Sequence, residues 1–247
     1  MIVTPDFVFI HLPKTGGTFV TKMLSRIYGD QLVNVDKHGT CSDIAEEHRA
    51  KPLLSTVRSP YDRYVSQYNF GWWKLYPGDY CGADAMREMY PQYPDLSFEE
   101  FLNLANTRFV NCHNEAPTGF VNNNFPADRQ LGWHTENFIR FFCRDARRVY
   151  AELDEPAIER ADFAKEMFDI HFLRTANLRR GLHEFLLRIG HRPEDLDFIL
   201  SHEKVLPDEG WQRPEGDRWE TYYTPELKEF VRTRERVIFR LFPEFEA

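Results

Sequence analysis

A short segment near the start of the chain holds the residues of a phosphate-binding loop in an unusual order. The segment reads HLPKTGGTFVTKML, and Lys14 precedes the glycine pair Gly16 and Gly17, whereas a Walker loop places its lysine after the last glycine. Consecutive glycines let the backbone approach a ligand closely, and a helix that begins there directs its free N–H groups at an anion. With the hydroxyls of Thr15 and Thr18, the loop predicts a pocket for a tetrahedral anion. The alternative is a plain strand–turn–helix connection.

A second segment, VRSPYDRYVSQYNF, carries further anion-binding side chains. Arg58 directly follows an apolar run, and Ser59-Pro60 is a typical helix start. Arg63 and Ser66 then fall on one helix face. Arg58 and Ser66 could clamp a second phosphate with forked N–H donors and a hydroxyl; the alternative is an amphipathic helix with solvated arginines. Two such sites imply a ligand with phosphates at two positions, such as a nucleotide with 5′- and 3′-phosphates.

These motifs need a scaffold, and the apolar pattern supplies one. Short apolar runs at 7–10, 53–57 and 170–173 predict three buried strands. Helical patterns follow, the first of them ending at Gly29 and the one after the third strand at Gly190. Strands that alternate with helices predict an α/β fold with a parallel sheet, in which ligands bind at the carboxyl ends of the strands. We expect a single domain over residues 1–247.

Other local signals are typical of helices and loops. Ser97 begins a capping box that opens a short helix. Residues 107–133 are rich in Asn, Pro and Gly and predict a long loop, and long loops are often functional. We also expect a helix capped near Ser42 and a last helix from Thr224-Pro225 to about Leu241.

The two motifs in this order resemble the paired motifs of sulfotransferases that use PAPS, 3′-phosphoadenosine 5′-phosphosulfate. FIHLPKTGGT followed by VRSPYDRYVSQYNF is similar to the carbohydrate-type branch, which includes the heparan sulfate 2-O-sulfotransferases and bacterial relatives. The resemblance implies a P-loop-containing, nucleotide-kinase-like α/β fold with a central parallel sheet flanked by helices. It also implies that no metal is required, because sulfuryl transfer involves less negative charge than phosphoryl transfer.

The resemblance assigns roles to individual residues. Those implied to hold the 5′-phosphosulfate are Lys14, Thr15, Gly16, Gly17 and Thr18, and those implied to hold the 3′-phosphate are Arg58 and Ser66. Lys14 would also be catalytic, because it would meet the oxygen between sulfur and phosphorus as negative charge grows there.

An acceptor hydroxyl must lose a proton to a general base as it attacks sulfur. We select His38 in VDKHGTCSDI, because HGT resembles the H-G-H segment of the 2-O-sulfotransferases, in which the first histidine is the base. The second histidine of that segment is Thr40 here. His113, His134 and Glu136 remain alternatives for the base.

Composition narrows the function classes. The net charge of −8, from 31 Lys+Arg against 39 Asp+Glu, disfavours nonspecific binding to nucleic acid or anionic membranes. No apolar run is long enough to span a bilayer. The four cysteines have no C-x-x-C spacing, so we expect a reduced, cytoplasmic protein. The alternative is a protein with two disulfides. No His/Cys spacing indicates zinc, and His11 is interpreted as structural.

The combined prediction is an enzyme that moves the sulfuryl group of PAPS to a hydroxyl and releases 3′,5′-ADP. The expected partner is a glycan, glycoconjugate or small hydroxylated acceptor. Aromatic residues between 68 and 80 could stack on sugar rings, although we expect most of them in the core. The alternatives are a P-loop kinase-like phosphotransferase and a non-catalytic module that binds 3′,5′-ADP or PAPS.

Overall fold

The computed structural model describes residues 1–203, 205, 210–211 and 216–246. The chain divides into two compact units, one of residues 1–58 with 168–208 and the other of residues 59–167 with 209–247. The single domain expected over 1–247 stays a prediction.

The first unit contains a five-stranded sheet in the order β3-β1-β2-β4-β7. Its strands are β1 (Ile2–Val3), β2 (Val8–Ile10), β3 (Val33–Asn34), β4 (Leu53–Val57) and β7 (Ile170–Arg174). The three strands predicted from the apolar runs are β2, β4 and β7, which lie side by side and run parallel. The strand β1 runs antiparallel to both of its neighbours. The carboxyl ends of β2, β4 and β7 therefore meet at one edge of the sheet.

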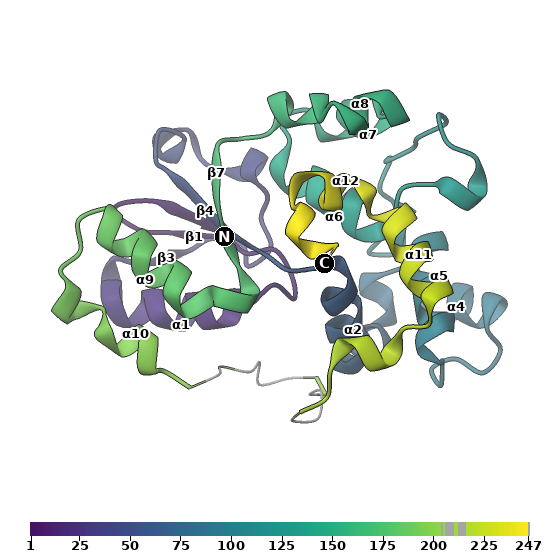
Figure 1. Ribbon diagram of the computed structural model, residues 1–247, viewed down its shortest axis with the longest axis horizontal. Helices are drawn as coiled ribbons and strands as arrows, with labels where there is room; N and C mark the ends of the chain where they lie inside the picture. The colour runs from purple at the N-terminus through teal and green to yellow at the C-terminus, as the bar shows by residue number, and fades with distance from the viewer. Residues whose placement is uncertain (204, 206–209, 212–215, 247) are drawn as a thin grey trace. The chain divides into compact units, whose positions relative to one another are not determined.

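Three helices accompany this sheet (Figure 1): α1 (Gly17–Tyr28), α9 (Leu178–Arg188) and α10 (Asp197–Ser201). The apolar face of α1, with Val20 and Leu24, packs in one core with Phe7 and Phe9 of the β2 segment. The side chain of Leu182 from α9 joins the same core. The predicted α/β class, with parallel central strands and helices beside them, is thereby confirmed.

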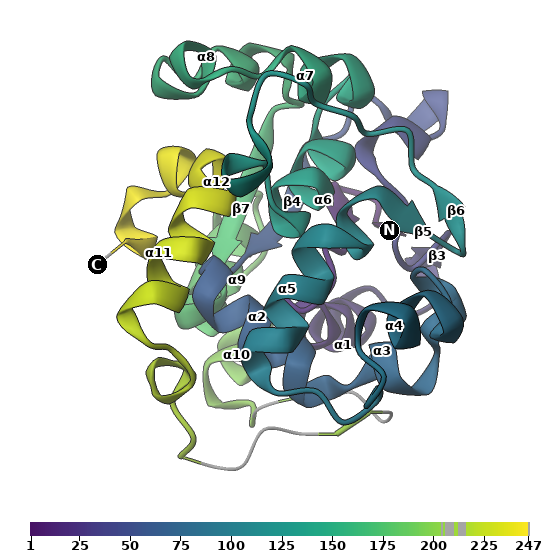
Figure 2. The same ribbon diagram turned by 90° about the vertical axis from the view of Figure 1, so that its right-hand side faces the viewer.

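The second unit is mostly helical (Figure 2). Its helices are α2 (Pro60–Phe70), α3 (Trp72–Leu75), α4 (Ala83–Met89), α5 (Phe98–Thr107), α6 (Trp133–Phe142), α7 (Ala146–Glu152), α8 (Glu155–Glu159), α11 (Pro225–Arg234) and α12 (Arg236–Leu241). Its main core includes Tyr64 of α2, Trp73 of α3 and Phe101 of α5. The expectation that most aromatics of residues 68–80 are core holds for Trp73, whereas Tyr76 is 45% exposed.

Several local predictions are confirmed. Ser97 accepts a hydrogen bond from the Glu100 N–H while the Glu100 carboxylate accepts one from the Ser97 N–H, which is the expected capping box. The segment 107–133 is largely irregular. It contains a hairpin of two-residue strands, β5 (Cys112–His113) and β6 (Ala116–Pro117), and two 3₁₀ turns, Phe109–Asn111 and Ala127–Arg129. All four cysteines are free thiols.

Two helix predictions are wrong. The expected helix near Ser42 is a single 3₁₀ turn, Cys41–Asp43, and its cap is Thr40. The expected last helix breaks at Glu235, which separates α11 from α12. The break has a physical reason: the buried Glu235 carboxylate accepts bonds from the N–H groups of His134 and Thr135 at the start of α6, where a negative charge is stabilised.

Candidate active site

The loop after β2 has the backbone geometry that its glycines allow. Lys14 has a φ of 64° and Gly16 a φ of 98°. Residues other than glycine rarely adopt such positive φ values. Gly16 is also the residue that precedes the first turn of α1, and a Cβ there would lie 2.6 Å from Cδ2 of Leu178. The two glycines are needed for different reasons. Gly16 adopts a positive φ close to Leu178, whereas Gly17 leaves space for the ring of His11.

The structure uses Thr15 differently from the expected hydroxyl donor to an anion. Its side chain is fully buried, and its Oγ1 donates to the carbonyl of Leu12 at 2.7 Å and lies 2.6 Å from Oγ1 of Thr56. Thr175 donates to the carbonyl of Thr15 at 2.6 Å. These bonds fasten the loop to the ends of β4 and β7, so what Thr15 can offer a ligand is its backbone. Thr18, in the first turn of α1, is partly exposed.

The structure brings Arg58 to this same loop. Arg58 follows β4 directly, and its Nη1 donates to the carbonyl of Lys14 at 3.2 Å. The two cationic residues that sequence reasoning selected therefore lie at one edge of the sheet. Ser66 lies on α2 in the other unit and is partly exposed, and its pairing with Arg58 stays a prediction.

The electrostatics of the loop suit an anion. Burial, together with the positive charges of Arg58 and Lys37, lowers the pKa of Lys14 to about 7. A cation that is destabilised by burial and by like charges gains most from a negatively charged ligand. These residues therefore fit a phosphosulfate or phosphate group. Lys37 was not selected from the sequence, although it is adjacent to His38 in DKHG.

His38 lies against His11 in the first unit. His38 is exposed as a residue, while its ring is partly covered: its Nδ1 lies 3.1 Å from the carbonyl oxygen of His11, and the two ring centroids are 5.1 Å apart. A carbonyl oxygen can only accept, so Nδ1 carries the proton and the neutral ring keeps its lone pair on Nε2. Partial burial lowers the pKa of His38, opposed by the bond to His11.

Thr40, which stands where the similar segment has a second histidine, has a structural role here. Its N–H and its hydroxyl both donate to Oδ2 of Asp43, at 2.8 and 2.9 Å. This capping box closes the turn that follows His38. Thr40 therefore fixes the end of the His38 loop.

The alternative bases all lie in the second unit. His134 is fully buried, with Nε2 2.6 Å from Oε1 of Gln67, and burial lowers its pKa well below the usual value. Glu136 is 1% exposed, and burial raises its pKa to about 7 against the opposing charge of Arg140. Neither side chain is exposed, and the choice of His38 as the base stays a prediction. His113 is exposed.

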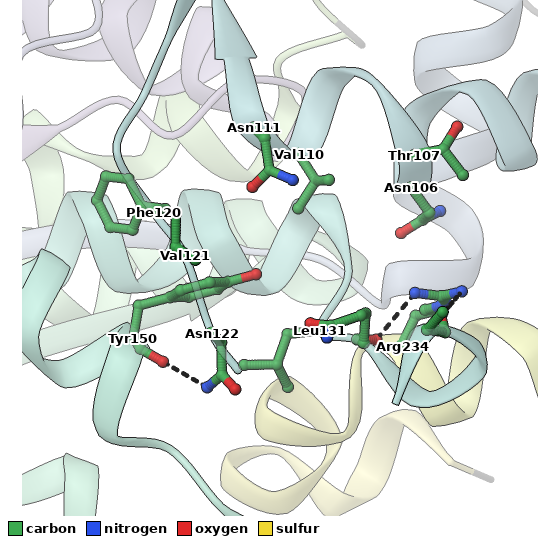
Figure 3. Close-up of a pocket in the computed structure, with 12 residues that line it drawn as sticks. Asn106, Thr107, Val110, Asn111, Phe120, Val121, Asn122, Leu131, Tyr150 and Arg234 are labelled. Atoms are coloured by element: carbon green, nitrogen blue, oxygen red, sulfur yellow. Dashed lines mark hydrogen bonds between the residues drawn. The ribbon is translucent and has the colours of Figure 1, made fainter. Parts of the chain in front are cut away.

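The second unit also contains a cavity of about 300 Å³ (Figure 3). Most of its wall comes from the predicted long loop, and the hydroxyl of Tyr150 and the amide of Asn111 point into it. Arg234 lies at its edge and donates to the carbonyls of Gln130 and Ala127. The loop thus encloses space in addition to connecting helices.

Comparison with known proteins decides the family. The sulfotransferase family profile matches residues 2–150, more than half of the chain. The chain belongs to the sulfotransferase family. The prediction of a PAPS-dependent sulfotransferase is therefore confirmed at the level of family and enzyme class.

Two further comparisons say less about this sulfotransferase. No curated protein sequence matches it. Among solved structures, the crystal structure of mouse sulfotransferase SULT7A1 complexed with PAP matches 97% of this chain and 83% of that chain, with 13% sequence identity and a TM-score of 0.38. Among the described residues, no helix combines the length and the apolar character needed to cross a membrane.

Proposed function

We propose that this sulfotransferase moves the sulfuryl group of PAPS to a hydroxyl of a carbohydrate, glycoconjugate or small hydroxylated acceptor. The observation that carries the proposal is the meeting of Lys14, Arg58 and His38 with the glycine loop at the carboxyl edge of the sheet. PAPS supplies an activated sulfuryl group whose leaving group is a phosphate.

In this proposal Lys14 and the backbone of the glycine loop bind the 5′-phosphate, which is the leaving group. Bond formation from the acceptor oxygen to sulfur accompanies cleavage of the bond from sulfur to the bridging oxygen, whose electron pair remains on the 5′-phosphate. The ammonium group of Lys14 stabilises that growing charge, and the N–H groups of Gly17 and Thr18 add the positive end of α1. Arg58, with Ser66, binds the 3′-phosphate.

His38 is proposed as the general base. Since its Nδ1–H is held by the carbonyl of His11, Nε2 is the atom that accepts the proton of the acceptor hydroxyl. The lowered pKa of His38 keeps the ring neutral at neutral pH, so the base is available without prior deprotonation.

The test combines calorimetry with turnover. The wild-type protein is titrated with 3′,5′-ADP and incubated with PAPS and a panel of glycans and small alcohols and phenols, with 3′,5′-ADP release as the readout. Lys14→Ala is expected to bind at least tenfold more weakly and to lower kcat about 10²- to 10³-fold. Lys22→Ala, at an exposed position of the same helix α1, is the matched control and should behave as wild type. Absence of 3′,5′-ADP binding by the wild type would contradict the proposal.

A second set of variants tests the base. His38→Ala should keep its affinity for 3′,5′-ADP and lose about 10²- to 10⁴-fold in kcat, whereas His113→Ala should change neither. Binding of 3′,5′-ADP by the wild type with no turnover on any acceptor would instead support a non-catalytic module. Magnesium-dependent turnover of ATP would support the kinase-like alternative.

A further inference from the structure

His11 contacts both halves of the proposed site. It follows β2 directly and is 6% exposed. On one side its ring occupies the space beside Gly17, where a Cβ would lie 2.7 Å from Cγ of His11 and nearer still to Cδ2 and Nε2. On the other side its carbonyl and its ring contact His38. One buried residue therefore connects the anion-binding loop with the candidate base.

We propose that His11 is a positioning residue that sets the orientation of His38 relative to the loop. The inference rests on the proposed role of His38 as base. His11 acts through shape, because its ring occupies the space beside Gly17 and also contacts the His38 ring. Its backbone carbonyl at the same time selects the tautomer of His38.

The charges around the two rings agree with a positioning role. Burial, together with the nearby His38 and Lys37, lowers the pKa of His11 to about 3. The ring is therefore neutral at working pH, so it neither transfers a proton nor adds charge beside Lys14. The groups that act on His38 are Lys37 and the N-terminal ammonium, which lower its pKa, and Asp36, which raises it. Cover by His11 contributes to the burial that lowers the pKa of His38 most.

The test measures the His38 ring directly, by NMR titration of the full-length protein. In His11→Ala the ring of His38 loses its cover, and we expect its titration midpoint to rise by at least half a pH unit. The acid limb of the profile of kcat against pH should also move to higher pH. We expect kcat to fall about tenfold or more, while the Kd for 3′,5′-ADP stays within threefold of wild type. His48→Ala, a partly exposed histidine of the same unit, is the control and should leave the His38 midpoint unchanged.

A second route reaches the same contact from the loop. In Gly17→Ala the new methyl group would overlap the His11 ring. The ring and the loop must then move apart, so the His38 midpoint should rise and 3′,5′-ADP should bind more weakly. In the double variant His11→Ala/Gly17→Ala the methyl group takes vacated space, so 3′,5′-ADP affinity should return toward wild type while the midpoint stays high. An unchanged midpoint in His11→Ala and Gly17→Ala would overturn the inference. Since the titration needs no turnover, this result is distinct from failure of the proposed sulfuryl transfer.

Discussion

Binding of 3′,5′-ADP should be accompanied by proton uptake at Lys14. With a pKa of about 7, about half of the Lys14 side chains are neutral at pH 7 and about nine-tenths at pH 8. A bound phosphate favours the charged form, which restores a pKa near the ordinary value for lysine. Each nucleotide should therefore take up about half a proton at pH 7 and about 0.9 proton at pH 8.

The same linkage sets the pH dependence of affinity. Between pH 7 and pH 9 the protonated fraction of free Lys14 falls from about one half to about one hundredth. The Kd for 3′,5′-ADP should therefore rise about 50-fold, or about 2.3 kcal/mol, provided that the pKa of Lys14 in the complex exceeds 9. The ligand phosphates contribute little in this window, because their second pKa is near 6.

Calorimetry in two buffers with different ionisation enthalpies, HEPES and Tris, measures the uptake at each pH. Lys14→Arg is the control, since its guanidinium stays charged throughout, and its Kd should change less than threefold between pH 7 and pH 9. Uptake below about 0.2 proton at pH 8 in the wild type would refute the reasoning. The reasoning would also be refuted if the Kd of Lys14→Arg changed with pH as much as that of the wild type. That result would assign the proton to another group, such as the N-terminal amine.

Three further predictions follow from single contacts. Gly16→Ala forces a side chain into a backbone with φ of 98°; it should destabilise the protein by about 1–3 kcal/mol and weaken 3′,5′-ADP binding at least tenfold in calorimetry. Glu235→Ala removes the carboxylate that begins α6 and should lower Tm by about 10 °C in a thermal melt, whereas Glu229→Ala at an exposed ion pair should not. Arg58→Lys loses the bond to the Lys14 carbonyl and should weaken calorimetric binding of 5′-AMP as well as of 3′,5′-ADP.

The strands that carry the site could be read from the sequence because each contains a short, mainly apolar run that is followed by a polar residue. The parallel strands β2 and β4 are buried along their whole length, and burial on both faces produces such continuous runs. The strand β7 was expected to be buried too, but it is only partly buried except at Leu173. The two-residue strands β1 and β3 could not be read, because they are defined by pairing with each other and with β2. Strands this short leave no periodicity in the sequence.

The break at Glu235 shows a different limit. The sequence RERVIFRLF around it is an ordinary helical pattern, and nothing local ends the helix. The helix ends because the Glu235 carboxylate bonds to Tyr64 and to the start of α6, which are distant in sequence. Tertiary contacts of this kind override propensity.

The site residues divide in the same way. Lys14, Gly16 and Arg58 could be selected because two motifs of anion-binding residue types follow two predicted strands in the same chain. Lys37 and the contact of His11 with His38 could not, because they depend on how the loop between β3 and β4 folds back on the end of β2. Thr15 has the residue type of a ligand donor, yet its hydroxyl serves the fold.

The reversed order of lysine and glycines has a physical consequence. Because Lys14 stands before Gly16, it belongs to the turn that leaves β2, and its carbonyl is within reach of the arginine that leaves β4. A lysine after the last glycine would belong to helix α1, and its carbonyl would not face the arginine that follows β4. Arg58 therefore braces the backbone of the residue whose ammonium group is proposed to hold the leaving phosphate. In the proposed site, one hydrogen bond then couples recognition of the 3′-phosphate by Arg58 to stabilisation of the 5′-phosphate by Lys14. A donor that lacks one phosphate would therefore bind less well at both phosphate positions.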